Sequence, residues 1–451
     1  MADIQNRLEK VGITIPEILL PRAELKQWAV IACDQFTQDR AYWKKAAEIA
    51  AGSPSSINMI FPEVFLDEEN SALRVEGIHS SMRNYLDSGI FYAPRQGFVY
   101  LERDTPFNRG RKGLVAAVDL EQYSWLPTAR PLIRSTEGTV EERLPPRMAI
   151  RRNAPVETPH ILLLIDDETN SLLQGLGERA KKASPVYKGE LMLDSGNISG
   201  WFLDSQDDFA FLADRLEELA RRALTRYETG HVASVKQPAS AAQPFLFAVG
   251  DGNHSLASAK GVWEEYKKAN SGADKHPCRY ALVEIENIYD PAIQFEPIHR
   301  IVFGLGFEEA LDAFSALPGF TSRIIGGQEE LVRLTRQPVK GNRFGLVNQD
   351  RYALVETDAG GLSTVCLQPL LDNAVSVSKG TLVIDYIHGE DELFRLARGS
   401  EKQATGILLP PVQKAGFFET IARNGPLPRK SFSMGEACEK RFYIECRKLF
   451  I

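Results

Sequence analysis

The chain has 451 residues, of which 43% are hydrophobic and 25% are charged, and its formal net charge is −7. This length exceeds the ~100–200 residues usual for one domain, so we expect about two or three packed units. The composition is that of an ordinary globular protein. The mild negative charge argues against a general affinity for nucleic acid, which normally goes with a surplus of basic residues.

The first residues and the cysteine content predict the cellular compartment of the protein. The first residues lack the basic patch and apolar stretch of a secretory signal, and the longest apolar runs are far shorter than the ~20 residues that span a bilayer. The five cysteines are scattered and include no C-x-x-C pair, which fits neither a disulfide framework nor a zinc knuckle. We therefore predict a cytoplasmic protein without a membrane partner.

Short apolar runs bounded by polar residues, glycine or proline predict buried strands along the chain. In order they are 28–32, 114–118, 161–165, 245–249, 280–285, 344–347, 352–355, 365–367, 382–387 and 406–409. Between the strands, the spacing of Phe209, Leu212 and Leu216 predicts an amphipathic helix, with Ser205 as a start signal. Another helix is predicted around Met82.

Strands and helices alternate irregularly, and the two strands around Gln349 predict a hairpin, so a purely parallel sheet is not expected. We predict an α+β (mixed α/β) fold with a central mixed sheet and flanking helices. The predicted parts are an N-terminal α/β region (1–125), a central region with the candidate active-site loop (126–306), a smaller α+β lobe (307–400) and a C-terminal segment that packs back on the central region (401–451). Residues 229–242 are predicted to be a polar connector.

The strand at 245–249 leads into Gly250, Asp251, Gly252, Asn253 and His254, and a helix is predicted over 255–268. The glycines permit a tight turn, and a helix that starts near Asn253 directs N–H groups toward an anion such as phosphate. Asp251 and His254 would supply an acid–base pair beside that anion. In the structural alternative, Asp251 or Asn253 caps the helix and the glycines only turn the chain.

A basic segment over residues 130–152 includes Arg134, Glu137, Arg147 and Arg151. If Pro146 starts a short helix, Arg147 and Arg151 lie one turn apart on one face and can clamp a phosphate. Glu137 is a candidate general base within this stretch. The alternative is a solvated arginine face with local salt bridges.

Three other places carry polar groups that suit a ligand. His299 and Arg300 stand next to apolar residues, Lys430 follows a proline near the end, and the strand at 28–32 leads to Asp34. Each also has a structural explanation, as a satisfied histidine, a basic loop or a helix cap. No cluster has metal-ligand spacing, and no G-x-S-x-G, Walker or G-x-G-x-x-G motif occurs, so conventional hydrolases, P-loop enzymes and Rossmann dehydrogenases lose support.

Several of these segments, in this order, resemble the bacterial and archaeal domain of unknown function 1015 (DUF1015) family over essentially the whole chain. They are residues 28–34, 134–138 with 145–147, 159–160 leading to 166–167, 250–254, 297–300 and 427–432. Many members carry Asp-Gly-His-His-Arg at the central loop, where this chain ends in Ser255 in place of the arginine. Arg147, Arg151 or Arg300 would then have to supply that charge.

More distantly, the strand, turn and helix at 245–268 are similar to the nucleotide-binding turn of the ParB and sulfiredoxin group, which includes nucleotide triphosphatases and a kinase of free serine. The resemblance implies nucleotide or phosphate binding at this element. The residues that we expect to contact phosphate or nucleotide are Gly250, Gly252, Asn253, Ser255, Arg134, Arg147, Arg151, His299, Arg300 and Lys430.

We therefore hypothesise a phosphotransferase that acts on a small hydroxylated metabolite such as serine. Asp251 or Glu137 would take the hydroxyl proton and His254 would stabilise the moving phosphoryl group. The expected cofactor is a nucleotide, ATP or ADP, with Mg²⁺ that arrives with it. A small molecule is the expected partner, nucleic acid and membrane are not, and a homo-oligomer is left open.

Two other functions use the same site. The first is a phosphatase or other hydrolase of a small phosphorylated metabolite, which turnover without any nucleotide would favour. The second is a non-enzymatic, nucleotide-responsive regulatory module that changes shape and binds a partner. A closed pocket in which Asp251, His254 and Arg147 converge would favour catalysis over this last function.

Overall fold

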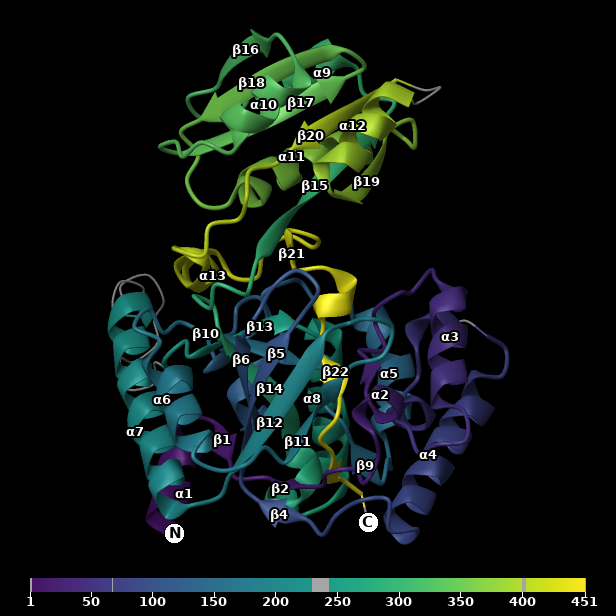
Figure 1. Ribbon diagram of the computed structural model, residues 1–451. Helices are drawn as coiled ribbons and strands as arrows, with labels where there is room; N and C mark the ends of the chain where they lie inside the picture. Colours follow the sequence, from purple (N-terminus) through teal and green to yellow (C-terminus); the bar gives the residue numbers. More distant parts are fainter. Residues whose placement is uncertain (1, 67, 229–242, 400–402, 451) are drawn as a thin grey trace. The chain divides into compact units, whose positions relative to one another are not determined.

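The protein divides into two units in the computed structural model, which describes residues 2–66, 68–228, 243–399 and 403–450 (Figure 1). Unit 1 comprises Met1–Ile293 and Gly435–Ile451, and unit 2 comprises Gln294–Met434. Each unit has its own sheet and its own buried apolar side chains. Within the described ranges, each helix falls short of the length or the apolar character that a bilayer crossing requires.

Unit 1 contains a large sheet, several short strand pairs and most of the long helices. Its helices are α1 (Ala2–Lys10), α2 (Leu25–Trp28), α3 (Arg40–Ala50), α4 (Ser71–Asp87), α5 (Leu144–Arg151), α6 (Ser171–Ala180), α7 (Gln206–Ala223) and α8 (Asn253–Ala269). Its strands are β1 (Ile13–Thr14), β2 (Glu17–Ile18), β3 (Val30–Ile31), β4 (Arg95–Gln96), β5 (Phe98–Asp104), β6 (Arg111–Asp119), β7 (Tyr123–Ser124), β8 (Ile133–Arg134), β9 (Val156–Glu157), β10 (Leu162–Ile165), β11 (Tyr187–Glu190), β12 (Asn197–Leu203), β13 (Phe247–Asp251), β14 (Tyr280–Asn287), β22 (Phe442–Tyr443) and β23 (Arg447–Lys448).

Unit 2 has a second sheet with helices packed on it. Its helices are α9 (Phe307–Phe314), α10 (Gln328–Thr335), α11 (Ser363–Val377), α12 (Glu390–Gly399) and α13 (Phe417–Asn424). Its strands are β15 (Phe295–Phe303), β16 (Thr321–Ile325), β17 (Asn342–Asn348), β18 (Arg351–Thr357), β19 (Val383–His388), β20 (Ala404–Leu408) and β21 (Phe432–Met434). The strand order is β16-β18-β17-β20-β15-β19, and β21 pairs with β15.

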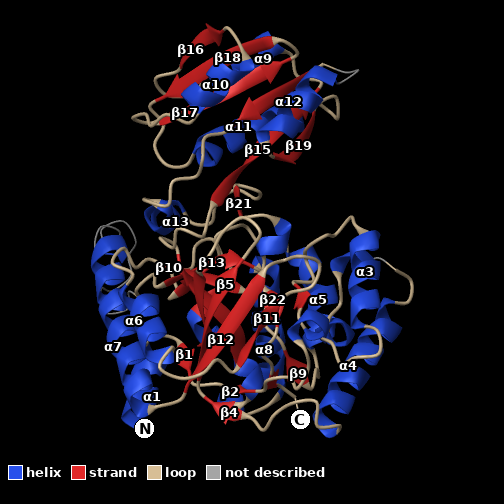
Figure 2. Cartoon of the chain, viewed as in Figure 1, coloured by secondary structure: helices blue, strands red, loops and turns tan. Residues whose placement is uncertain are grey.

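The sheet of unit 1 is mixed. Its strand order is β11-β12-β5-β6-β14-β10-β13-β8-β7, with β1 paired to β6. The pairs β10–β14 and β8–β13 are parallel, whereas β6–β14 and β10–β13 are antiparallel. Figure 2 shows α1, α6 and α7 on one side of this sheet and α3 and α4 on the other. The predicted mixed α/β fold is therefore confirmed.

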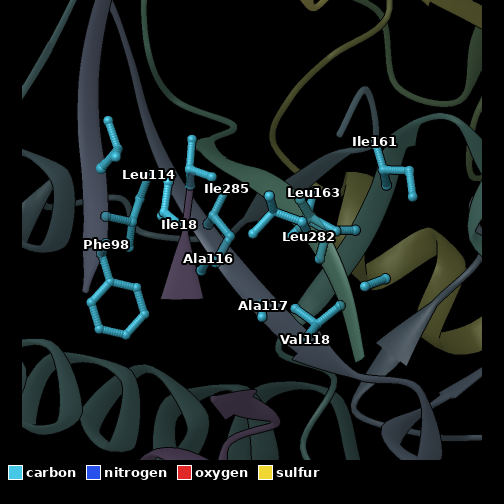
Figure 3. Close-up of a cluster of buried hydrophobic side chains, with 14 of the residues drawn as sticks. Ile18, Phe98, Leu114, Ala116, Ala117, Val118, Ile161, Leu163, Leu282 and Ile285 are labelled. Atoms are coloured by element: carbon cyan, nitrogen blue, oxygen red, sulfur yellow. The ribbon is translucent and has the colours of Figure 1, made fainter. Parts of the chain in front are cut away.

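The centre of this sheet explains why its strands read as unbroken apolar runs. Leu114 and Val118 of β6 and Leu282 of β14 are fully buried, and Leu163 of the neighbouring β10 lies beside them (Figure 3). A strand that is covered on both faces has no solvent-facing side, so most consecutive positions are apolar. The same burial explains why sequence patterns located β6, β10 and β14.

The predicted amphipathic helix is α7, and its start was also predicted correctly, because Ser205 Oγ accepts a hydrogen bond from Asp208 N at 3.1 Å. The predicted hairpin is β17–β18, which pair antiparallel around residues 349–350. The predicted strand at 365–367 was wrong, since these residues lie inside α11. A run of three apolar residues cannot distinguish a buried helix from a strand. The predicted strand at 28–32 is only Val30–Ile31, because Trp28 ends α2.

The units differ from the parts expected from sequence. Regions 1–125 and 126–306 share one sheet, because β5 and β6 pair with each other and β6 pairs with β14. The second unit runs from Gln294 to Met434. It therefore starts before and ends after the smaller lobe expected at 307–400. The final segment returns to unit 1, where β22 pairs with β3 and β23 with β9. The expected connector at 229–242 lies outside the described residues.

Charged side chains of the sheet strands β6 and β14 are also buried in unit 1. The guanidinium of Arg441 bridges Glu284 and Glu445, and all three side chains are at most 1% exposed. Arg111 Nε lies 2.9 Å from Glu286 Oε1, and Glu286 is fully buried. Burial, with a further contribution from nearby Glu284, raises the pKa of Glu286 to about 8 even though Arg111 opposes the shift.

This raised pKa makes unit 1 sensitive to alkaline pH. An unfolded glutamate ionises near pH ~4.3, so between that pH and about 8 the folded protein binds the proton more tightly than the unfolded chain. Stability should therefore fall as pH rises through this window, by up to ~1.4 kcal/mol per pH unit from this one group. We expect Glu286→Gln to flatten the curve of unfolding free energy against pH between about 5 and 8, which lies inside that window. Urea denaturation at each pH measures the unfolding free energy. An unchanged slope would contradict this prediction.

Candidate functional site

Strand register brings two distant polar segments together at one edge of the unit 1 sheet. In the antiparallel pair β10–β13, Leu162 lies opposite Asp251, so the residues just before β10 meet the turn just after β13. His160 stands two positions before Leu162 in the sequence. The parallel neighbour β8 pairs Arg134 with Ala248, which carries Ser135 to the same level.

The turn after β13 is built around Gly252. It precedes α8 as the cap residue with φ of 80°, a left-handed conformation that favours glycine. A Cβ atom at this position would lie 3.2 Å from the Cα atom of Ile161, so the turn packs tightly on the entry to β10. Neither Asp251 nor Asn253 occupies the cap position, and no side chain caps the helix. The structural alternative, in which one of these two side chains caps α8, is therefore not what the structure has.

Asp251 has a cation, Lys440, and another carboxylate, Asp34, near it. Its Oδ2 atom is 3.4 Å from Lys440 Nζ, and its Oδ1 atom accepts a hydrogen bond from Gly252 N. The carboxyl pKa is raised, mainly by burial and also by nearby Asp34, while Lys440 and His160 oppose the shift. A carboxylate with a raised pKa is closer to the value that suits a general base near neutral pH.

A hydrogen-bonded chain runs next to this turn. Ser255 Oγ lies 2.7 Å from His160 Nε2, and the other ring nitrogen, Nδ1, lies 2.9 Å from Tyr443 Oη. The tyrosine oxygen also accepts a hydrogen bond from Cys33 N at 3.1 Å. When Nδ1 of His160 carries the ring proton, Nε2 is the acceptor for the Ser255 hydroxyl, which is the tautomer that activates a serine.

Ser255 and His160 also line a cavity of about 130 Å³ inside unit 1. Arg147 and Glu63 form an ion pair on its wall, with Arg147 Nε 2.8 Å from Glu63 Oε1. Burial raises the pKa of Glu63, although Arg147 pulls it back. Apolar side chains such as Met59 complete the wall. Arg147 therefore lines the same cavity as Ser255, at the start of α8, but its guanidinium is ion-paired with Glu63.

The Ser135–Glu137 segment supports the turn. Ser135 Oγ and Thr136 N both donate to Asn253 Oδ1, at 2.6 and 3.2 Å, and Thr136 Oγ1 donates to Val249 O at 2.5 Å. Glu137 is half-buried, and its carbonyl oxygen, 2.7 Å from Ser135 Oγ, is the alternative acceptor for that single hydroxyl hydrogen. Asn253 is therefore a positioning residue that holds these two loops together.

His254 occupies the first turn of α8, where Val140 N donates to its Nε2 atom at 3.3 Å. A neutral ring with Nε2 as acceptor carries its proton on Nδ1, so that nitrogen can donate. The role predicted for His254 stays a prediction, and in this tautomer Nδ1 is the hydrogen-bond donor. Gly250 and Asp251, the first two residues of the expected loop, lie within β13 itself.

Two of the predicted phosphate ligands have carboxylate partners of their own. Arg151 does lie one turn after Arg147 on α5, as predicted, but it pairs with Glu157 and donates to Tyr280 O at 3.1 Å. Arg134 is buried, and its Nη2 atom lies 2.5 Å from Glu228 Oε1. A buried guanidinium that is matched to a carboxylate gives little net charge to a ligand. Arg147 and Arg151 line the same cavity, each with its own carboxylate partner, and their role as a phosphate clamp stays a prediction.

The three remaining predicted ligands lie in unit 2. His299 Nδ1 accepts from Leu409 N at 3.1 Å, and burial lowers the pKa of its ring to about 4. Arg300 is fully buried and donates from Nε to Gln368 Oε1 at 3.0 Å. Lys430 is exposed and has a left-handed backbone, with φ of 58°. Their role as phosphate ligands stays a prediction.

Sequence reasoning missed Lys440, Tyr443 and Glu63, which the fold adds to the site. None belongs to a motif, and each comes from a segment far from residues 250–255 in the chain. One signal was available near the end of the chain: charged residues 440–441 and 445 flank the apolar run 442–444. Charges on both sides of a buried strand indicate partners inside the protein.

A family model described as "Protein of unknown function (DUF1015)" matches residues 16–375, which is most of the chain. The chain belongs to the DUF1015 family. The resemblance drawn from sequence motifs is thereby confirmed. No curated protein matches this DUF1015 sequence significantly.

Several solved structures show weak similarity to this DUF1015 protein, of which three are described. A free serine kinase in complex with AMP has 12% identity and a TM-score of 0.37, and the match covers 74% of this chain and 92% of that one. A conserved hypothetical protein from Pyrococcus furiosus has 11% identity, a TM-score of 0.33, and 73% and 90% coverage. SbnI with a C-terminal truncation, from Staphylococcus aureus, has 11% identity, a TM-score of 0.33, and 73% and 82% coverage. Similarity at this level is too weak to carry a functional assignment.

Proposed function

We propose that unit 1 is a small-molecule phosphotransferase whose reaction takes place at the 250–255 turn. One observation carries the proposal: Asp251 has a raised pKa and lies 3.4 Å from Lys440, at the start of a long helix. A base, a cation and helix N–H groups in one place are what phosphoryl transfer to a hydroxyl group needs. The expected substrate is a small hydroxylated metabolite, with serine as the first to test.

Each group has a task in this reaction. The first turn of α8 and Lys440 would hold phosphate oxygens, because N–H groups and an ammonium both favour negative charge. Asp251 would take the proton from the acceptor hydroxyl, with Glu137 as a second candidate for that role. His254 would donate a hydrogen bond from Nδ1 to the phosphoryl group as its charge redistributes.

A nucleotide, ATP or ADP, would be the phosphoryl donor. Lys440 and the α8 N-terminus would hold its phosphates. Lys440, like Arg134 and Arg151, has a carboxylate partner, but that partner is Asp251, the residue proposed to act as the base. Over residues 2–66, 68–228, 243–399 and 403–450, no group of three or more His, Cys, Asp or Glu side chains could hold a metal ion. A Mg²⁺ ion would then be bound mainly by the nucleotide's own phosphates.

The test is a direct assay of transfer. The full-length protein is incubated with Mg²⁺ and either ATP or ADP, together with serine or one of a panel of small hydroxy acids and alcohols, and products are followed by ³¹P NMR. We expect a new phosphate ester that depends on both the nucleotide and the acceptor. If no acceptor yields an ester with either nucleotide, and neither nucleotide shifts the thermal transition, the proposal fails.

A hydrolase of phosphate esters is the second candidate. The Ser255 hydroxyl lies within hydrogen-bond distance of His160 Nε2, and a serine paired with a histidine base in this way can act as a nucleophile. Ser255 Oγ would attack phosphorus while its proton passes to His160. The bond to the leaving group would break, and the leaving oxygen would take that proton. Water would then release the phosphate. Ester hydrolysis without nucleotide, with a phosphoryl group found on Ser255 by mass spectrometry, would support this function.

A further inference from the structure

Unit 2 contains a cavity of about 600 Å³ that the proposed reaction does not use. The residues that line it lie between Pro297 and Ser431, within unit 2. Its walls come from the end of α10, the start of β17, the loop that leads into α11, and the segment 409–424 that includes α13. The volume falls in the ~300–1,000 Å³ range of small-molecule sites.

The loop that leads into α11 is held in place at the cavity. Asn342 Nδ2 donates to Ala359 O at 2.6 Å and to Gly361 O at 3.1 Å, while its Oδ1 atom accepts from Ser363 Oγ at 2.7 Å. The cap residue Leu362 has no side-chain hydrogen bond to the helix. The first turn of this 15-residue helix therefore meets the cavity with its N–H groups and the positive end of its dipole.

Two buried hydroxyl groups in the cavity wall point independently to a ligand. Thr335, at the end of α10, and Thr364, in the first turn of α11, both line the cavity and are 1% and 4% exposed. Among the described residues, neither hydroxyl oxygen has a hydrogen-bond partner. A buried hydroxyl without a partner is destabilising, so a pair of them in one cavity wall indicates that a bound group satisfies them.

The charged lining favours an anion. It contains Arg336, Arg343 and Arg423 but one acidic side chain, Glu419, and of the three arginines Arg343 is largely buried in an ion pair with Glu356. Arg336 pairs with Glu390 at 2.9 Å and Arg423 with Glu419, yet the two arginine side chains remain 59% and 63% exposed. Exposed pairs of this kind are weak and can exchange for a ligand anion. Apolar groups form the rest of the wall, among them Pro338, Val339, Leu409 and Pro410.

We propose that this cavity is a second ligand site, which binds a small organic molecule through a phosphate or carboxylate group. The oxyanion lies at the first turn of α11, where it accepts hydrogen bonds from the backbone and from Thr364. The organic part of the molecule packs on the proline-rich wall. Arg336 and Arg423 face the same space and add attraction for negative charge. This site is separate from the 250–255 turn and does not depend on the function proposed for it.

Isothermal titration of the full-length protein with three probes tests the proposal: inorganic phosphate, phenyl phosphate and benzoate. We expect phenyl phosphate to bind more tightly than inorganic phosphate, because only the former has an apolar part. Benzoate distinguishes a carboxylate site from a phosphate site. The variant Thr364→Val keeps the shape of the side chain but removes the hydroxyl, and it should weaken binding of the preferred probe at least about tenfold.

The stability of the free protein gives a second readout. Because Thr364→Val removes a buried hydroxyl that has no protein partner, the unliganded variant should be as stable as the parent or more so, and a fold defect is not expected. Thr321→Val, at an exposed position of β16, is the matched control and should change neither binding nor stability. The proposal is overturned if no probe binds saturably, or if the preferred probe binds to Thr364→Val as it does to the parent.

Discussion

Asp251→Asn is expected to lower turnover by about 10²- to 10⁴-fold, the range associated with loss of a general base. The amide has the shape of the protonated carboxyl but cannot accept the proton of the attacking hydroxyl. Nucleotide binding should change much less, because the α8 N-terminus and Lys440 remain. The measurement is initial rate by ³¹P NMR, together with nucleotide affinity by titration, for parent and variant.

A matched control separates the role of this carboxyl from general effects of the mutation. Asp87 is exposed at the end of α4, so Asp87→Asn makes the same chemical change away from the turn and should leave the rate unaltered. The raised pKa adds a further expectation. The carboxyl pKa of Asp251 is higher in the folded protein than in the unfolded chain, so the ionised carboxylate at pH 7 destabilises the folded state. Asp251→Asn removes this ionisation and should therefore be at least as stable as the parent at pH 7. A fully active Asp251→Asn would remove Asp251 from the mechanism.

Arg441→Met is expected to reduce the free energy of unfolding by about 3–5 kcal/mol, the largest stability effect that we predict. Burial alone would lower the pKa of Arg441, but Glu445 and Glu284 outweigh it and raise the pKa instead. Removal of the guanidinium therefore leaves two carboxylates at most 1% exposed without their counter-charge. Urea denaturation of parent and variant measures the difference.

The control for this prediction is Arg83→Met, which removes an exposed arginine from α4 and should cost less than about 0.5 kcal/mol. The pH dependence has a definite sign. The pKa of Glu284 is lowered, because Arg441 and the neighbouring arginines outweigh burial. Its stabilising contribution is present above pH ~4.3 and disappears as pH falls through the folded pKa. Arg441→Met should therefore differ least from the parent in acid, and an equal difference at all pH values would contradict the ion-pair explanation.

Much of the site's local structure could be predicted from the sequence. The apolar run before Gly250 and the helical spacing after Asn253 gave β13 and α8 within a few residues. Pro146 indicated a helix that begins two residues earlier, at Leu144, and this helix, α5, carries both Arg147 and Arg151. These features depend on neighbours within about one helical turn, where periodicity and backbone preferences act directly.

The composition of the site was decided by the tertiary structure. The antiparallel register of β10 and β13 put His160 next to Ser255, and the return of the final segment put Lys440 against Asp251. No local pattern encodes either contact, because each depends on the order of strands in the sheet.

The same holds for charge. In sequence, Arg147 and Arg151 look like two free cations, yet in the fold Glu63 pairs with the first and Glu157 with the second, on the wall of the same cavity. The sequence by itself determined the mixed α/β class, several of the buried strands and amphipathic helices, and the family of this protein. Only the folded chain decided which charged groups are matched and which can meet a ligand, because the energy of a charge depends on the burial and the partners around it, and both come from segments far apart in the chain.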